Sequence, residues 1–138
     1  MEPKLFVATK ALIFYNNKVL IIKESSKYQD GTNEGKFDLV GGRIKPGQRF
    51  DESLKREVKE ETGLDITIGK PFYVDEWHPK VKNEEWQIVG IFFICFANSD
   101  KVKLSNDHNE FLWISPEEHK KYNLIENYHN VFEAYLNN

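Results

Sequence analysis

The stretch from Gly41 to Leu64 constrains this chain more than any other part, because its turn residues and charges together define a local structure. A glycine pair and a Pro-Gly pair open the stretch, and no further Gly or Pro follows until Gly63. This spacing predicts a helix from about Phe50 to Thr62 that ends at Gly63, since glycine readily adopts the positive φ of a helix end. The stretch should therefore form a loop, a helix and a second loop.

The faces of this helix can be assigned at about 100° per residue. Three apolar side chains recur at i, i+4 and i+8 and form the stripe that should pack on a core. They are Phe50, Leu54 and Val58. Three acidic side chains, spaced at i, i+3 and i+4, gather at the edge of this stripe instead of on the far face. They are Glu57, Glu60 and Glu61.

Three glutamates this close are unfavourable in an ordinary helix, because like charges at these spacings repel by roughly 0.2–0.5 kcal/mol per pair. Carboxylates in the last turns also oppose the negative end of the helix dipole. A divalent cation would reverse both effects, and Mg²⁺ prefers a few carboxylate oxygens with water and substrate phosphate beside them. The glutamates alone also fit a solvated acidic edge partnered by Lys55, Arg56 and Lys59. The flanking glycines favour the metal site.

The glycines and glutamates fall at fixed spacings along the stretch. The spacings follow the pattern Gly, five residues, Glu, seven residues, Arg-Glu, aliphatic, any residue, Glu-Glu, any residue, Gly, aliphatic. The matching positions are Gly42, Arg56, Glu57, Val58, Glu60, Glu61, Gly63 and Leu64. The stretch resembles the Nudix box, the signature of the Nudix hydrolases. One position departs from the pattern, because Gln48 stands where the family usually has its first Glu.

The resemblance implies an α/β fold, the Nudix-type α/β/α sandwich with a mixed β-sheet, in which the box helix and its loops line a cleft. It also implies Mg²⁺, or alternatively Mn²⁺, as the cofactor for hydrolysis of a phosphoric anhydride bond. Glu57 and Glu61 are then expected to bind the metal directly, together with a backbone carbonyl at Gly41 or Gly42. Glu60 is expected as a further ligand or as the base.

The resemblance implies further roles for two polar residues of the box. Arg56 would orient the carboxylates through charge-assisted hydrogen bonds. The Glu that Gln48 replaces usually serves that charge network or the outer part of the metal site. Gln48 can donate and accept hydrogen bonds but supplies no charge. We therefore expect weaker metal binding or an altered metal count, and not inactivity as such.

The general base of Nudix enzymes comes from the box or from a Glu outside it. The outside candidate here is Glu110, which lies in a segment resembling one that places a Glu just before a strand with Trp in relatives. Glu110 is expected as a fourth metal ligand or as the base, and a surface acid in a loop is the alternative. His108, in the same segment, is interpreted as a loop histidine and not as a catalyst.

The implied partner is a small nucleotide, since the family hydrolyses a nucleoside diphosphate linked to another group. The short chain favours a nucleoside triphosphate or a modified (8-oxo) nucleotide. Pro79, about fifteen residues beyond the box, resembles a feature of ADP-ribose-cleaving members and keeps ADP-ribose or a sugar nucleotide as the alternative. A non-catalytic nucleotide-binding module is a third hypothesis, which the Gln48 departure favours and the intact glutamates oppose.

Substrate contacts are expected at Gly41 and among the aromatic residues. The aromatics either stack on a base or belong to the core. They are Phe6, Phe37, Trp77, Trp86 and Phe111, of which Phe37 and Trp77 are the chosen candidates.

Outside the box, β-branched and aromatic runs bounded by turn residues predict strands. These are Leu5–Phe14, Val19–Lys23, Phe37–Val40, Ile66–Ile68, Phe72–Asp75, Trp86–Phe96 and Phe111–Ile114. A hairpin turn is expected at Tyr15–Lys18 and an exposed loop at Glu24–Lys36. The continuous apolar run Trp86–Phe96 indicates a strand covered on both faces, so helices must pack on the sheet.

Two helical segments are expected near the end of the chain. Ser115-Pro116-Glu117-Glu118 has the form of a capping box that begins a short helix. Ile125–Leu136 places aromatic residues at helical spacing and should form a second helix. These aromatics are interpreted as core and not as a ligand platform.

The length predicts a single domain over residues 1–138, and 40% hydrophobic with 30% charged residues is typical of a globular protein. The net charge of −3 argues against a nucleic-acid polymer as partner. No signal peptide or membrane span is expected. The lone Cys95, interpreted as a small buried hydrophobe, suits a reducing compartment, so a cytoplasmic location is expected. Family members are often dimers, which leaves a homodimer open.

Overall fold

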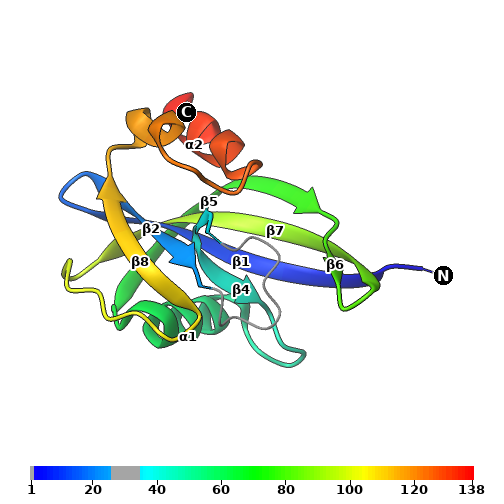
Figure 1. Cartoon of the computed structure of the whole chain (residues 1–138). Coiled ribbons are helices and arrows are strands. Elements are labelled where there is room, and N and C mark those ends of the chain that lie inside the picture. The colour runs from blue at the N-terminus through cyan, green and yellow to red at the C-terminus, as the bar shows by residue number, and fades with distance from the viewer. Residues whose placement is uncertain (1, 26–34) are drawn as a thin grey trace.

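A mixed β-sheet forms the centre of the fold, and helices cover both of its faces (Figure 1). The computed structural model describes residues 2–25 and 35–138. Its strands are β1 (Lys4–Tyr15), β2 (Lys18–Glu24), β3 (Phe37–Asp38), β4 (Val40–Arg43), β5 (Ile66–Trp77), β6 (Lys80–Val81), β7 (Glu84–Ala97) and β8 (His108–Ile114). Its helices are α1 (Phe50–Thr62), the 3₁₀ helix η1 (Pro116–Lys121) and α2 (Tyr128–Leu136). Most of the loop predicted at Glu24–Lys36 lies outside the described residues.

The sheet follows the order β3-β2-β1-β7-β5, and three further strands pair off this path. β1 and β7 run parallel, in register from the pair Lys4–Trp86 to the pair Phe14–Phe96. The other pairings are antiparallel, including β4 with β1, β6 with β7 and β8 with β2. The predicted mixed sheet is confirmed, and β4 brings the glycine pair of the box beside the middle of β1.

The hairpin between β1 and β2 forms at the predicted turn. Asn16 and Asn17 have φ angles of 48° and 65°, the pair of positive values that a tight type I′ hairpin requires. Asparagine tolerates this region better than most residues do. The two strands leave the turn in the register Tyr15–Lys18.

The two faces of β1 belong to two separate cores. Leu12 and Phe14 pack with α2 in one core, whereas Ala11 and Ile13 pack with α1 in the other. Both sets alternate along the strand because successive side chains point to opposite faces. β7 divides in the same way, with Phe92 in the first core and Phe93 in the second, so the predicted strand covered on both faces is confirmed. The arrangement is the α/β/α layering expected from the sequence (Figure 1).

Helix α1 begins and ends where the sequence predicts, at Phe50 and Thr62. Leu54 and Val58 are fully buried against the sheet, while Phe50 is partly exposed and stacks on Phe93 with ring centroids 5.7 Å apart. Gly63 ends the helix with a φ of 74°, and its N–H donates to the carbonyl of Lys59. The helix is thus fixed at its C-terminal end and along one face.

The region after α1 differs from the prediction. Ile66–Trp77 is one strand and not two, with irregular register around Pro71. β5 lies at an edge of the sheet, where bulges accommodate a residue that lacks an N–H. The charged segment Glu76–Glu85, for which no strand was predicted, contains a small hairpin of β6 and the start of β7. Its turn residues Lys82 and Asn83 both have positive φ.

The C-terminal helices also differ in detail from the prediction. The short helix is a 3₁₀ helix, and the Ser115 side chain makes no capping bond; the Glu118 N–H donates to the Ser115 carbonyl instead. The last helix begins at Tyr128 and not at Ile125, because the preceding residues pair with β3: the Ile125 N–H donates to the carbonyl of Phe37. None of the described helices is long and apolar enough to cross a membrane.

Candidate active site

The packing of α1 places Glu57 directly against the glycine pair of β4. A Cβ atom added at Gly42 would lie 3.2–3.3 Å from the three carboxylate atoms of Glu57. Such contacts are tighter than ordinary packing, so only a glycine leaves this carboxylate its present position. The helix and the strand thus form a cradle in which a carboxylate meets the main chain.

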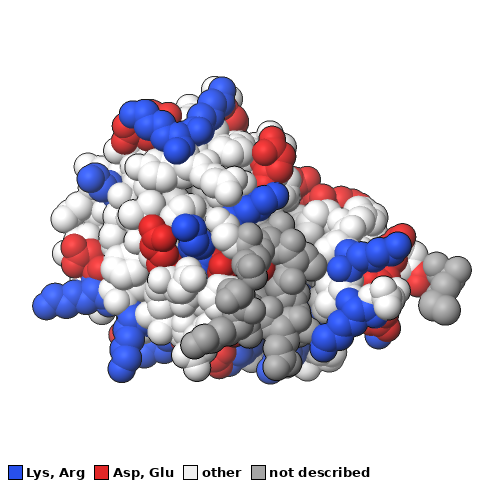
Figure 2. Space-filling view, viewed as in Figure 1, with Lys and Arg blue, Asp and Glu red and all other residues white. Residues whose placement is uncertain are grey.

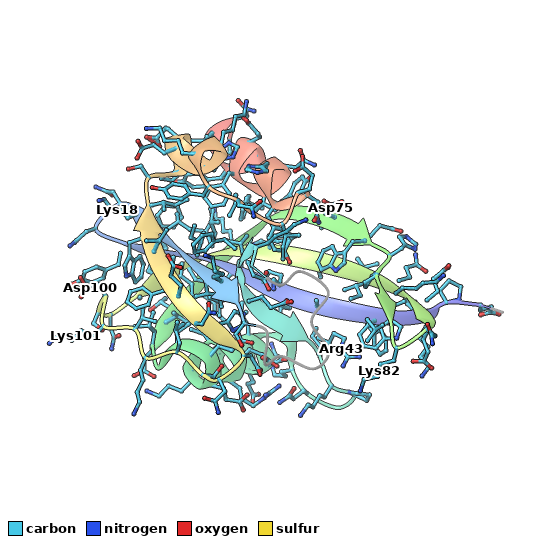
Figure 3. The ribbon with its side chains drawn as sticks, in the orientation of Figure 1. Lys18, Arg43, Asp75, Lys82, Asp100 and Lys101 are labelled. Atoms are coloured by element: carbon cyan, nitrogen blue, oxygen red, sulfur yellow. The ribbon has the colours of Figure 1, made fainter. Side chains whose placement is uncertain are left out.

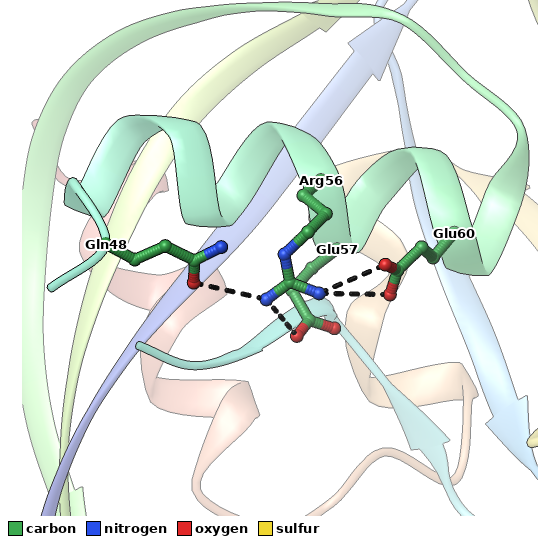
Figure 4. A network of polar contacts seen from close by, with 4 residues as sticks. All are labelled: Gln48, Arg56, Glu57 and Glu60. Atoms are coloured by element: carbon green, nitrogen blue, oxygen red, sulfur yellow. Dashed lines mark hydrogen bonds and ion pairs between the residues drawn. The ribbon is translucent and has the colours of Figure 1, made fainter. Parts of the chain in front are cut away.

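Arg56 links the polar residues of the box (Figure 4). Its Nη1 atom donates to both carboxylate oxygens of Glu60 at 3.1 Å. Its Nη2 atom donates to Oε1 of Glu57 and to Oε1 of Gln48, each at 3.3 Å. The guanidinium therefore holds two glutamates in fixed orientations, and Gln48 joins the network as a neutral acceptor.

Glu61 lies one turn after Glu57 on α1 and lines the site as well. Burial raises the pKa of its carboxyl well above the usual range. The Lys10 ammonium opposes this shift, whereas the carboxylates of Asp38, Glu57 and Asp107 add to it. An ionised Glu61 thus lacks sufficient positive charge around it, which a bound cation would supply.

Two hollows meet at this point. The first has a volume of about 430 Å³ and is lined by residues of the sheet, the β5–β6 segment and the start of α2. The second, about 700 Å³, lies between β1, β4 and the loop before α1. Both hollows are lined by Gly41, Gly42, Arg43 and Glu61. The first of them is hereafter called the cavity.

A buried ion pair in the cavity wall was not predicted. The Nζ atom of Lys10 lies 3.1 Å from Oδ1 of Asp38 and 5.5 Å from the ring centroid of Tyr128. Burial alone would lower the pKa of Lys10, but Asp38, Tyr128 and Glu61 together raise it. Lys10 is 5% exposed, so its charge depends on these partners. A lysine within the apolar run of β1 was the available signal.

The remaining predicted site residues lie at different distances from the cradle. Trp77 and Pro79 line the cavity. Phe37 is buried in the core and lines neither hollow. Glu110 lies on β8 and pairs with Lys23 at 3.1 Å, outside the lining of both hollows. His108, expected in a loop, is instead the buried first residue of β8 and lines the cavity.

The donor atoms at the cradle suit a hard cation, since carboxylate and carbonyl oxygens are the ligands that Mg²⁺ prefers. Within residues 2–25 and 35–138, no three His, Cys, Asp or Glu side chains are placed to hold one ion. Glu57 and Glu61 line the site while Glu60 turns to Arg56. Two carboxylates with open positions around them fit Mg²⁺, which keeps water and substrate phosphate among its ligands.

The surface around the site carries both signs of charge. Figure 2 shows lysine, arginine and acidic side chains interspersed over the viewed face. That face presents no continuous basic stripe, in line with the net charge of −3. Small ligands in the two hollows suit this surface better than a long polyanion does.

Comparison with known proteins agrees with this geometry. A profile of the NUDIX domain matches residues 4–135. The nucleoside triphosphatase NudI of Escherichia coli O1:K1 / APEC is 29% identical over 101 residues, which cover 68% of this chain and 72% of that protein. The MutT protein of Methanosarcina mazei Go1 superposes with a TM-score of 0.84 at 29% identity, covering 96% of this chain and 94% of that chain. The ORF135 protein of E. coli shares the fold, with a TM-score of 0.76 at 20% identity over 97% of this chain and 90% of its own. The chain belongs to the Nudix hydrolase family.

Proposed function

We propose that this chain hydrolyses a phosphoric anhydride bond of a nucleoside triphosphate or of a modified, for example 8-oxo, nucleotide, with Mg²⁺ as cofactor. The observation that carries the proposal is the Glu57 carboxylate seated against Gly42 and held by Arg56. The proposal is supported by the two hollows beside these carboxylate and carbonyl oxygens, which are large enough for a small ligand, since such sites measure roughly 300–1,000 Å³.

The residues of the cradle would have different roles in binding the metal. Glu57, Glu61 and the main-chain carbonyl of Gly42 would hold Mg²⁺. Bound Mg²⁺ neutralises charge on the phosphates and lowers the pKa of the attacking water. Arg56 keeps Glu57 in its orientation through the bond at 3.3 Å, so that little reorganisation is needed when a cation binds. Mn²⁺ would be accepted by the same oxygen ligands.

Two glutamates are candidates for the base that takes the proton of the attacking water. Both oxygens of Glu60 accept hydrogen bonds from Arg56, and Glu110 pairs with Lys23. Glu60 lies on the box helix, whereas Glu110 must leave its lysine to reach the cradle. Glu60→Gln and Glu110→Gln can be compared through the pH dependence of kcat, because loss of the base removes the acidic limb of the profile.

The substrate class is supported by the cavity and by the relatives. Trp77 offers a ring face and the Lys10–Asp38 pair offers a donor and an acceptor, which together suit a nucleobase. NudI is named a nucleoside triphosphatase, which favours triphosphates. Pro79 also lines the cavity. Its resemblance to ADP-ribose-cleaving enzymes keeps ADP-ribose as the second candidate.

The test is turnover of a panel that contains the common nucleoside triphosphates, 8-oxo-dGTP, ADP-ribose, dinucleoside polyphosphates and sugar nucleotides, each with Mg²⁺, Mn²⁺ or a chelator. We expect one triphosphate to be preferred, with turnover abolished by the chelator. Glu57→Gln should remove turnover. Glu52→Gln, the same change at an exposed position of α1, is the matched control and should leave it intact.

Two outcomes would contradict the proposal in different ways. Preference for ADP-ribose would keep the enzyme and change its substrate class. Tight nucleotide binding without turnover of any panel member, in folded protein with Mg²⁺, would favour the non-catalytic binding module, and Gln48 would then be the first residue to restore to Glu.

A further inference from the structure

Arg43 occupies the junction of the two hollows. It is the last residue of β4, follows Gly42 directly and lines both hollows. Figure 3 shows it at the end of β4, toward the hairpin that carries Lys82. Its side chain is exposed, so the guanidinium can meet a ligand that enters from solvent.

Two aromatic rings hold this guanidinium. The centroids of Phe6 and Trp86 lie 4.8 Å apart, and Cζ of Arg43 is 4.4 Å from each of them. Both distances are within the range of a cation–π contact. β1 and β7 carry the rings and pair in parallel here, so the contact joins three strands of the sheet.

The rings are themselves held in place by an ion pair. The indole Nε1 of Trp86 donates to Oε1 of Glu84 at 3.4 Å, and Glu84 pairs with Lys4 at 2.8 Å. The carboxylate of Glu84 thus pairs with Lys4 and not with Arg43. Within the described part of the chain no carboxylate pairs with Arg43.

The other two arginines of the sequence behave differently. Arg49 pairs with Asp51 at 3.0 Å, and Arg56 pairs with Glu57 and Glu60. Arg43 therefore differs from both: two rings hold its position, and among the described residues its N–H donors have no anionic partner. Guanidinium donors match phosphate oxygens in pairs, and rigid placement lowers the entropy lost on binding.

We propose that Arg43 is a phosphate-binding residue of the substrate site, and that Phe6 and Trp86 are positioning residues that act through it. The proposal rests on the proposed function, since it assigns the phosphate contact of that same site. It also gives Phe6 and Trp86 a task other than stacking on a base. The polyphosphate would then lie at the junction, between the cradle and the cavity.

Binding of non-hydrolysable phosphates tests the proposal without requiring turnover. The probes are tripolyphosphate in which methylene groups replace the bridging oxygens, and α,β-methylene-dGTP, each titrated with Mg²⁺ in a calorimeter. We expect Arg43→Ala to weaken both by about tenfold to a hundredfold, the usual range for a hydrogen bond to a charged group. Arg43→Lys keeps the charge but loses the planar guanidinium fork, so its affinity for the probes should fall between that of the wild type and that of Arg43→Ala.

A matched control is available directly before helix α1. Arg49 lies over the ring of Phe50 at 5.6 Å but lines neither hollow. Arg49→Ala changes the net charge by the same amount and should leave both affinities within about twofold, because exposed charges at a distance are screened by salt. Equal losses in Arg43→Ala and Arg49→Ala would overturn the proposal.

A double-mutant cycle separates the positioning role from direct stacking on a base. Phe6→Leu should weaken binding of the tripolyphosphate analogue in the wild-type background and have no further effect once Arg43 is Ala. An unchanged affinity of Arg43→Ala for the tripolyphosphate analogue would refute the phosphate contact, as would wild-type protein that binds neither probe. Binding that depends on Arg43 in a protein that hydrolyses no nucleotide would instead refute the proposed function and leave this inference standing.

Discussion

Gly42 shows how a single missing side chain shapes the site. Its hydrogen lies where a Cβ would press on the Glu57 carboxylate, at 3.2–3.3 Å. Gly42→Ala should therefore shift Glu57 and lower kcat/KM by about tenfold to a hundredfold, since small misplacements of a catalytic group have effects of that size. The fold should be little affected, because Gly42 does not need a positive φ. Turnover and the melting temperature, measured on the same sample, check both halves of this prediction.

Gly41→Ala is the natural comparison, because this change should lower the stability of the fold instead of acting mainly on turnover. Gly41 has a φ of 137°, and an added Cβ would overlap the carbonyl oxygen of Thr9 on β1. We expect a loss of about 1–3 kcal/mol in the free energy of unfolding, from backbone strain and from separation of the two strands. Equal stability of the two alanine variants would contradict this assignment.

Gln48 is the one departure of the box from the family pattern. It accepts a bond from Arg56 at 3.3 Å without adding negative charge. Gln48→Glu should strengthen that bond and the negative potential at the cradle, so half-maximal activity should need a lower Mg²⁺ concentration. Gln48→Leu controls for loss of the hydrogen bond alone. Metal titrations that coincide for wild type and Gln48→Glu would contradict the prediction.

The Lys10–Asp38 pair should be costly to break from one side. Lys10→Met removes the ammonium and leaves Asp38 in the cavity wall without its 3.1 Å partner. We expect about 3–5 kcal/mol of destabilisation, the usual range for an uncompensated buried charge. The double change Lys10→Met with Asp38→Leu should recover part of this loss. Chemical denaturation of Lys10→Met, Asp38→Leu and the double variant measures it, and additive losses would show that the two charges are not coupled.

At the scale of elements, local signals decided which predictions succeeded. The bounds of α1 followed from the apolar stripe at i, i+4 and i+8 and from Gly63 as a helix end. No local signal indicated that β5 would continue through Pro71, because β7 supplies its hydrogen bonds from a distant part of the sequence. The start of α2 was missed for the same reason, since Leu124 and Ile125 are held by Phe37.

The contact between η1 and α2 should make stability depend on pH. His119 is 2% exposed; its Nε2 lies 3.2 Å from Oε1 of Glu133 and its Nδ1 lies 2.9 Å from Nδ1 of His129. If Nε2 donates to Glu133, Nδ1 accepts from His129, which requires a neutral His119 ring. Burial lowers the pKa of His119 further than Glu133 raises it.

The sign of this dependence follows from linkage. Because the pKa of His119 is lower in the folded state, the unfolded chain binds its proton first as the pH falls below about 6.5, and folded protein loses stability over that window. His108, whose pKa burial also lowers, acts in the same direction. His119→Phe, which keeps the stacking on Phe132, should flatten the curve of unfolding free energy between about pH 7.5 and 5. An unchanged slope would exclude His119 as a source.

At the scale of the whole molecule, the fold could be predicted further than the site. The layers followed from strands with two apolar faces and from amphipathic helices, both of which are visible in the sequence. The box supplied only the half of the site carried by α1 and the glycine pair. The other half, Lys10 and Asp38, comes from strands that meet only through the register of β1 with its neighbours. That register depends on long-range packing, which spacing along the chain does not encode.

Metal binding should therefore be measurable as stability of the entire fold. The cradle joins α1 to β4 and β1, so the cation that we propose for Glu57 and Glu61 would bind only the folded state. At a concentration of 100 times its Kd, Mg²⁺ should add about 2.7 kcal/mol to the free energy of unfolding and raise Tm by several degrees. Glu57→Gln and Glu61→Gln should each reduce this shift, while Glu52→Gln should retain it. This measurement requires no substrate. If Mg²⁺ leaves the Tm of the wild-type protein unchanged, then either the cation binds at another site or its binding depends on the phosphates of the nucleotide.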